Sequence, residues 1–193
     1  DRIALARAYG EGATSDTLFQ AASLSKFVAA VGAMRLVERG ILGLDEDVNG
    51  KLTSWKVPSN GYDRDHPVTL RGLLSMTAGI NVPGFIGYKP GEPLPNLTQI
   101  LYGAPPANSP PVAVIAEPAS SFAYSGGGYA IAEALMIDAA QAAFPQLMDD
   151  LVLKPAGMAL SSFVQPLPPG RTPEAAKGHY RNGKPLPGGW HVF

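Results

Sequence analysis

Ser23 and Lys26 are the two residues of this sequence whose types and spacing favour nucleophilic chemistry. A serine hydroxyl is a weak nucleophile and needs a nearby base, together with donors that stabilise an oxyanion. Residues three apart on a helix face one another, so a lysine at this spacing can take the serine's proton. Serine is also a favoured helix N-cap, and this spacing arises by chance about once in a chain of this length. Both a catalytic and a capping role are therefore open for Ser23.

A helix must position this pair, and the residues after Ser23 predict one. Gly40 supplies a C-terminal stop for this helix. Lys26 directly precedes apolar residues, where a merely solvated lysine is less expected. The apolar residues that recur at helical spacing are Phe27, Val28, Val31, Met34 and Val37.

A second polar group stands before another expected helix. Tyr124 and Ser125 precede three consecutive glycines, residues 126–128, and an apolar helical stretch follows them. Glycines at this position would let the backbone approach a substrate closely. The alternative is a glycine-rich turn in which Tyr124 serves only as a packing aromatic.

The remaining elements are expected to be mainly helices and loops around a sheet of which few strands are visible. Residues 80–118 contain nine prolines, which exclude a regular helix or a central strand and predict a loop-rich insertion. From residue 166 onward the chain is rich in turn residues. Residues 2–10 are an expected strand, and 17–23 are expected to be a second short strand or an extended approach. The expected helices are 69–76, 97–103, 110–117, 126–143 and 144–158.

Four blocks of this sequence, taken in order, resemble the serine beta-lactamase and penicillin-binding-protein-like family. The resemblance is to the branch of class C beta-lactamases, D-alanyl-D-alanine carboxypeptidases and family VIII esterases. It covers roughly residues 8–160. The blocks are "LFQAASLSKFVAAVGAMRLVERGILGLDEDV", "VTLRGLLSMTAGI", "FAYSGGGYAIAEALM" and "LKPAGM".

The resemblance implies an α+β fold of two lobes, with an antiparallel sheet flanked by helices. It also implies that residues 1–193 form a single domain, cut at both ends, in which 80–118 is an insertion and the C-terminal strands with a third motif are absent. Ser23 would be acylated, Lys26 would be the activating base, and Tyr124 would share proton transfer with the leaving group. The Ser23 amide would form half of an oxyanion hole, and the strand of the third motif would supply the other half.

The sequence departs from the family pattern at three points. Gly126 stands where the family's Tyr-x-Asn motif has its asparagine, so we expect Ser125 and Gly126 to form the substrate-binding part of this motif without that amide. Met76 stands where many members have histidine. No Lys-Thr-Gly or His-x-Gly follows Tyr124.

Composition narrows the function classes further. A formal net charge of -1, without a run of one sign, argues against nucleic acid as a partner. The chain has no cysteine, no apolar stretch long enough to span a membrane, and no phosphate-binding glycine motif. Its three histidines, His66, His179 and His191, lie in expected loops, so we expect neither a metal nor an organic cofactor. The oligomeric state is open, and family habit places a periplasmic or secreted location ahead of a cytoplasmic one.

The leading hypothesis is a serine hydrolase that forms an acyl-enzyme on the carbonyl of a beta-lactam, a D-Ala peptide or a small ester. Its partner is accordingly a small-molecule or peptide substrate. The alternative hypothesis is a non-catalytic binding or scaffold protein that keeps the fold without turnover.

Overall fold

The structure is a computed structural model that describes residues 4–10, 12–62 and 65–193. Segment η2 (Asp149–Leu153) is a π-helical continuation of α5 (Phe144–Met148), and η1 (Val48–Gly50) and η3 (Pro169–Glu174) are 3₁₀ helices. No helix in these ranges is both long enough and apolar enough to cross a membrane. The helices are α1 (Leu24–Glu38), η1 (Val48–Gly50), α2 (Leu70–Ser75), α3 (Leu97–Tyr102), α4 (Gly126–Ala140), α5 (Phe144–Met148), η2 (Asp149–Leu153) and η3 (Pro169–Glu174).

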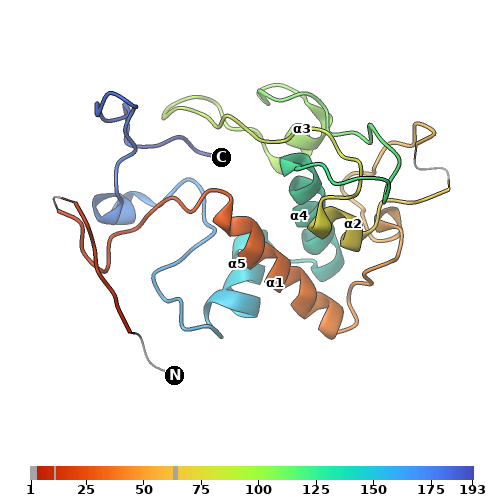
Figure 1. Cartoon of the computed structure of the whole chain (residues 1–193), viewed down its shortest axis with the longest axis horizontal. Helices are drawn as coiled ribbons and strands as arrows, with labels where there is room; N and C mark the ends of the chain where they lie inside the picture. Colours follow the sequence, from red (N-terminus) through yellow and green to blue (C-terminus); the bar gives the residue numbers. More distant parts are fainter. Residues whose placement is uncertain (1–3, 11, 63–64) are drawn as a thin grey trace.

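Helix α4 is the centre of the packing, because α1, α2, α3 and α5 all contact it (Figure 1). Its sequence is small and apolar on nearly every side, and side chains such as Ile131 and Met136 are almost completely buried. Gly32 of α1 allows a close approach, since a Cβ atom at this position would lie only 2.7 Å from the Met148 sulfur. The helix that follows Ser23 is therefore held firmly against the helical core.

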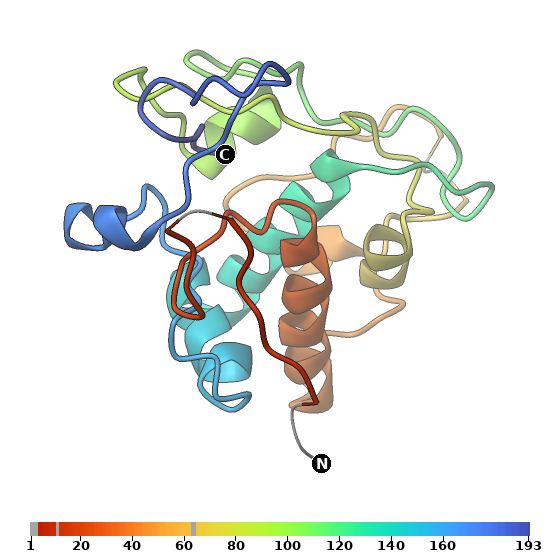
Figure 2. The same ribbon diagram turned by 60° about the vertical axis from the view of Figure 1, so that its left-hand side comes forward.

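Two regions of the chain differ sharply in burial. All buried hydrophobic side chains of the described residues lie between Ala33 and Leu153. We call residues 24–157 the core segment, and residues 4–10, 12–22 and 158–193 the flanking segments. The flanking segments lie beside the core segment (Figures 1 and 2). They are joined to each other by a parallel bridge between Leu18 and Ala175.

The expected helix after Ser23 is confirmed as α1, but its apolar face was only partly predicted. Its buried residues are Gly32, Ala33 and Leu36, whereas Phe27 and Met34 are exposed. The apolar pattern did not predict the buried face correctly, because apolar residues occur on both sides of this helix. Burial follows the smaller residues that fit against the neighbouring helices.

Other helices agree with the sequence in kind. Thr69 caps α2, and its side chain accepts a hydrogen bond from the Gly72 amide. Helix α3 lies inside the expected range 97–103, and the expected helix 144–158 divides into α5 and η2. The expected helix at 110–117 is wrong. This segment is extended, and Val114 pairs with Ile80 in an antiparallel bridge.

The expected antiparallel sheet is not observed among the described residues, where pairing is limited to isolated bridges. The expected strand at 2–10 begins outside the described residues, and its described part, 4–10, has no strand partner. In the second expected strand, 17–23, only Leu18 makes a bridge. A strand needs a neighbour to pair its backbone groups, and apolar composition alone supplies none.

Candidate active site

A tight turn presents Ser23 at the start of α1. Ala22, immediately before it, has a left-handed backbone with φ of 45°, which is costly for a residue with a side chain. Ser23 occupies the N-cap position, yet its side chain makes no capping hydrogen bond. Its backbone N–H makes no observed hydrogen bond within the described ranges, so this donor is free for an oxyanion. The Ser23 hydroxyl therefore does not cap the helix, which was the alternative role expected for it.

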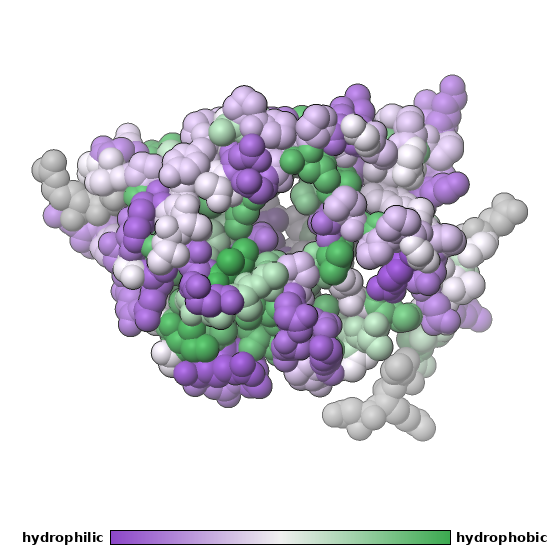
Figure 3. Space-filling model, turned by 180° about the vertical axis from the view of Figure 1, so that it is seen from behind, coloured by the Kyte–Doolittle hydropathy of each residue, from purple (hydrophilic) through white to green (hydrophobic). Residues whose placement is uncertain are grey.

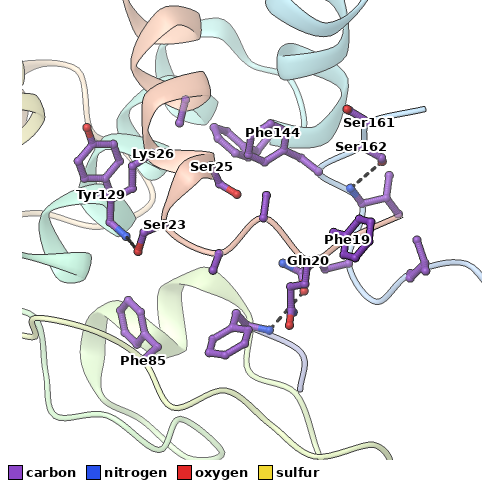
Figure 4. Close-up of a pocket in the computed structure, with 18 of the residues that line it drawn as sticks. Phe19, Gln20, Ser23, Ser25, Lys26, Phe85, Tyr129, Phe144, Ser161 and Ser162 are labelled. Carbon is purple, nitrogen blue, oxygen red and sulfur yellow. Dashed lines mark hydrogen bonds between the residues drawn. The ribbon is translucent and has the colours of Figure 1, made fainter. Parts of the chain in front are cut away.

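The Ser23 hydroxyl instead receives two hydrogen bonds from groups that the sequence separates widely. The Tyr124 O–H donates to Ser23 Oγ at 2.8 Å, and Lys26 Nζ donates to the same atom at 3.3 Å. Figure 4 shows Lys26 directed at Ser23, with Tyr129 beside the lysine and Phe85 across the cavity. The structure therefore brings together the three residues that the sequence predicts as catalytic.

The charge of Lys26 acts on two aromatic rings of this site. Its Nζ lies 5.2 Å from the centre of the Tyr124 ring and 5.7 Å from that of Tyr129. The pKa of Tyr124 is lowered, first by its hydrogen bond with Ser23 and then by Lys26. The pKa of Tyr129 is raised by burial and by its proximity to Tyr124. The two tyrosines are thereby distinguished, and Tyr124 is the one that gives up a proton more easily.

Ser125 has a structural role where the sequence suggested a substrate contact. Its buried hydroxyl caps α4 by accepting from the Gly128 amide at 2.9 Å, and it donates to the Asn81 carbonyl at 2.7 Å. Gly126 does line the cavity beside Ser23. A Cβ atom at Gly127 would lie 2.9 Å from the Asn81 carbonyl oxygen, so this glycine lets the insertion pack on the helix start.

Ser23, Lys26 and Tyr124 open onto a cavity of about 850 Å³ between the core segment and the flanking segments. From behind, the surface is hollowed near its centre, with hydrophobic residues beside the hollow (Figure 3). The cavity is large enough for a small organic or short peptide substrate. Its aromatic lining residues, apart from tyrosines, are Phe19, Phe85, Phe144, Phe163, Trp190 and Phe193.

Comparison with known proteins places this arrangement in a family. The family model described as Beta-lactamase matches residues 1–192. The chain belongs to the Beta-lactamase family. This family in general comprises serine hydrolases. No curated protein sequence matches the chain.

Solved structures share the fold of this Beta-lactamase family member. A beta-lactamase/D-alanine carboxypeptidase from Yersinia pestis is 22% identical with a TM-score of 0.66, covering 92% of this chain and 49% of its own. EstCE1, a hydrolase with promiscuous acyltransferase activity, is 24% identical with a TM-score of 0.63, covering 91% and 49%. A penicillin-binding protein from Bacillus halodurans is 21% identical with a TM-score of 0.58, covering 83% and 47%. The chain thus spans about half the length of these proteins.

Sequence reasoning missed two polar residues of the cavity of this Beta-lactamase family member, Tyr129 and Glu133. They lie one helical turn apart on α4. A signal for Glu133 was present, because it is the only charged residue between Gly126 and Ile137. Burial raises the pKa of Glu133 to about 7.

Proposed function

We propose that this protein is a serine hydrolase that forms an acyl-enzyme on an ester or amide carbonyl, with Ser23 as the nucleophile. The observation that supports this most strongly is the Ser23 hydroxyl itself. It leaves the adjacent helix uncapped and accepts hydrogen bonds from Tyr124 and Lys26. A hydroxyl held by two groups that exchange protons, at the edge of a cavity, fits an activated nucleophile.

In the proposed reaction, Ser23 Oγ attacks the substrate carbonyl carbon and its proton passes to Lys26. The carbonyl electrons move to oxygen, and the Ser23 N–H stabilises the oxyanion that forms. When the intermediate collapses, the bond to the leaving group breaks and Tyr124 delivers a proton to that group. Water then attacks the acyl-serine carbonyl, the same groups remove its proton, and Ser23 is regenerated.

Tyr124 lies closer to the Ser23 hydroxyl than Lys26 does. Its oxygen lies closer to Ser23 Oγ than the lysine nitrogen does, at 2.8 Å against 3.3 Å. Its pKa is lowered by Ser23 and Lys26, so its phenolate is more accessible than that of an isolated tyrosine. We infer that Tyr124 protonates the leaving group beside Ser23, and that the ammonium formed when Lys26 takes the serine proton stabilises the negative charge left on the tyrosine.

Covalent labelling tests the nucleophile. The intact protein is treated with a fluorescent fluorophosphonate and with a fluorescent penicillin, and bound dye is measured after denaturation. We expect labelling of the wild type and none of Ser23→Ala. Ser25→Ala is the matched control, because Ser25 lines the same cavity and should keep labelling. Equal labelling of the wild type and Ser23→Ala would exclude Ser23 as the nucleophile.

A non-catalytic binding or scaffold protein is the second candidate. The observation in its favour is Gly126, which replaces the asparagine amide of the family's motif. Turnover separates the two candidates, because a binding protein gives at most one equivalent of released product. A burst of one equivalent with no steady release would therefore support the binding protein over the hydrolase.

The substrate is best approached by comparing nitrocefin with p-nitrophenyl butyrate. Phe19, Phe85 and Phe193 line the same cavity as Ser23, which favours an apolar group next to the carbonyl. We therefore propose faster hydrolysis of the small ester than of the beta-lactam. A periplasmic or secreted location stays a prediction.

A further inference from the structure

Glu133 is an ionisable group of the cavity that the proposed reaction does not use. It lies on α4 one turn, about 5 Å, beyond Tyr129, and it lines the same cavity as Ser23. It is the only acidic residue among the described residues that line this cavity. The residues that line this cavity are otherwise mainly hydroxyl, aromatic and apolar, among them Ser25, Phe144 and Met136.

No side chain of the described residues pairs with the Glu133 carboxyl, through either a hydrogen bond or an ion pair. Glu133 is partly buried, and a carboxylate in such a place without a partner is costly, because it loses part of its hydration and no opposite charge compensates. The raised pKa of Glu133, about 7, reflects this burial alone. Such a group near a reaction centre is a candidate for function.

The other ionisable groups that line the cavity are committed elsewhere. Lys26 of α1 donates to Ser23 and lies over the rings of Tyr124 and Tyr129. Arg171 of η3 contacts the Glu174 carboxylate and donates to a backbone carbonyl. The two cations of the cavity thus have partners, and a negative charge on Glu133 is compensated by neither.

We propose that Glu133 recognises a cationic group of the substrate, an ammonium that enters the cavity together with the scissile carbonyl. This inference extends the proposed hydrolase function and rests on it, because the bound molecule is a substrate only if Ser23 reacts with it. A bound ammonium would supply the missing partner of the carboxylate. The aromatic rings that line the same cavity, including Tyr129 one turn away on α4, suit a cation, since ring faces attract positive charge. Recognition strengthens as Glu133 ionises, that is, as pH rises through about 7.

Binding of tetramethylammonium tests the cation site without requiring turnover. Calorimetry on the wild type should give a dissociation constant about tenfold lower at pH 8.5 than at pH 6. Glu133→Gln should bind about tenfold more weakly at pH 8.5 and lose the pH dependence. Glu117→Gln removes the same charge from an exposed position outside the cavity, and it should bind like the wild type. A wild type whose affinity does not change with pH would overturn the proposal without any variant.

Turnover then places the site relative to Ser23. Two substrates are compared, the p-nitrophenyl ester of trimethylammoniobutyric acid and its uncharged isostere, in which carbon replaces nitrogen. At pH 8.5 we expect the wild type to favour the cationic ester about tenfold in kcat/KM, through KM. In Glu133→Gln, the ratio of kcat/KM for the cationic ester to kcat/KM for the uncharged ester should fall to about one. The ratio of the two kcat values should be the same as in the wild type.

The failures of the two proposals are distinguishable. If tetramethylammonium binds as expected but neither ester is hydrolysed, the cation site stands and the hydrolase does not. If the uncharged ester is hydrolysed but the wild type and Glu133→Gln show the same ratio, the hydrolase stands and the role of Glu133 is overturned.

Discussion

The core segment and the flanking segments of this chain are built on different principles. In the core segment, helices pack through fully buried side chains such as Leu36 and Ile131. In the flanking segments, no hydrophobic side chain of the described residues is fully buried, and Leu18 and Ala175 are joined by backbone pairing. The first region has the contacts that fix geometry, and the second has few of them.

Ser23 lies at the boundary between these regions, and this location separates chemistry from recognition. Lys26 and Tyr124, which contact the serine hydroxyl, both belong to the core segment. Much of the opposite cavity wall, including Phe19 and Phe193, comes from the flanking segments. The difference teaches that the groups proposed to transfer protons belong to the well-packed region, whereas the walls proposed to select a substrate can change without disturbing them.

Tyr124→Phe tests this division most strongly. The change removes one hydroxyl that contacts Ser23, so we expect kcat/KM to fall about 10²- to 10³-fold. Stability should hardly change, because the Tyr124 side chain is 44% exposed. Hydrolysis of p-nitrophenyl butyrate and thermal unfolding measure the two effects. Tyr129→Phe is the matched control, because Tyr129 lies in the first turns of α4 and lines the same cavity, and it should cost less than tenfold. Equal losses in both variants would contradict a direct role for Tyr124.

Leu36→Ala and Leu160→Ala compare the two regions with the same chemical change. Leu36 is 1% exposed in the core segment and should lose about 3 kcal/mol of unfolding free energy through the cavity left behind. Leu160, 47% exposed in the C-terminal flanking segment, should lose less than about 1 kcal/mol. Urea unfolding measures both values. Similar losses would mean that the flanking segments pack more tightly than the structure indicates.

Glu133 lines the cavity between the two regions, and Glu133→Gln tests its effect on the pH dependence of the unfolding free energy. The folded pKa of Glu133 is raised to about 7, so folded protein retains a proton that unfolded protein releases. This contribution is fully present below the pKa of the unfolded chain, near 4.3, and is lost as pH rises to about 7. Glutamine cannot ionise, so the variant should become more stable than the wild type by about 1 to 3 kcal/mol above pH 7.

Denaturant unfolding at pH 4.5 and at pH 8 measures this effect of Glu133→Gln. The two proteins should have similar unfolding free energies at the lower pH. Glu117→Gln, an exposed change of the same kind, should show no comparable gain at either pH. A loss of stability in Glu133→Gln at pH 8 would mean that the carboxylate has a stabilising partner after all.

The core segment was largely predictable from sequence because its signals are local. Thr69 is a capping residue before an apolar stretch, and Gly40 is a stop, so the beginning of α2 and the end of α1 could be placed. Ser23, Lys26 and Tyr124 could be joined only through the resemblance, since 101 residues separate the serine from the tyrosine. Their contact is a property of the packing of α1 on α4.

The remaining features depend on contacts between distant residues. Phe27 and Val28 are equally apolar, yet only the packing of α4 and α5 decides that Phe27 is exposed. The segment 110–117 is rich in apolar residues that fit a helix or a strand, and its pairing with residues 79–81 makes it extended. The sequence predicts Ser125 as a substrate contact, whereas in the structure its hydroxyl is buried and caps α4.

A buried and an exposed helix cap can also be compared inside the core segment. The difference in unfolding free energy between the two variants is expected to be the smallest of these comparisons. Ser125→Ala removes a cap that is 3% exposed and leaves the Asn81 carbonyl without its donor, so we expect a loss of about 1 to 2 kcal/mol. Asn96→Ala removes the cap of α3, where the side chain is exposed and water can replace it, so about 0.5 to 1 kcal/mol should be lost. Urea unfolding of both variants measures the difference. If Asn96→Ala lost more unfolding free energy than Ser125→Ala, burial of the Ser125 cap would not determine how much it stabilises the protein. The geometry of the two capping hydrogen bonds would then have to explain both losses.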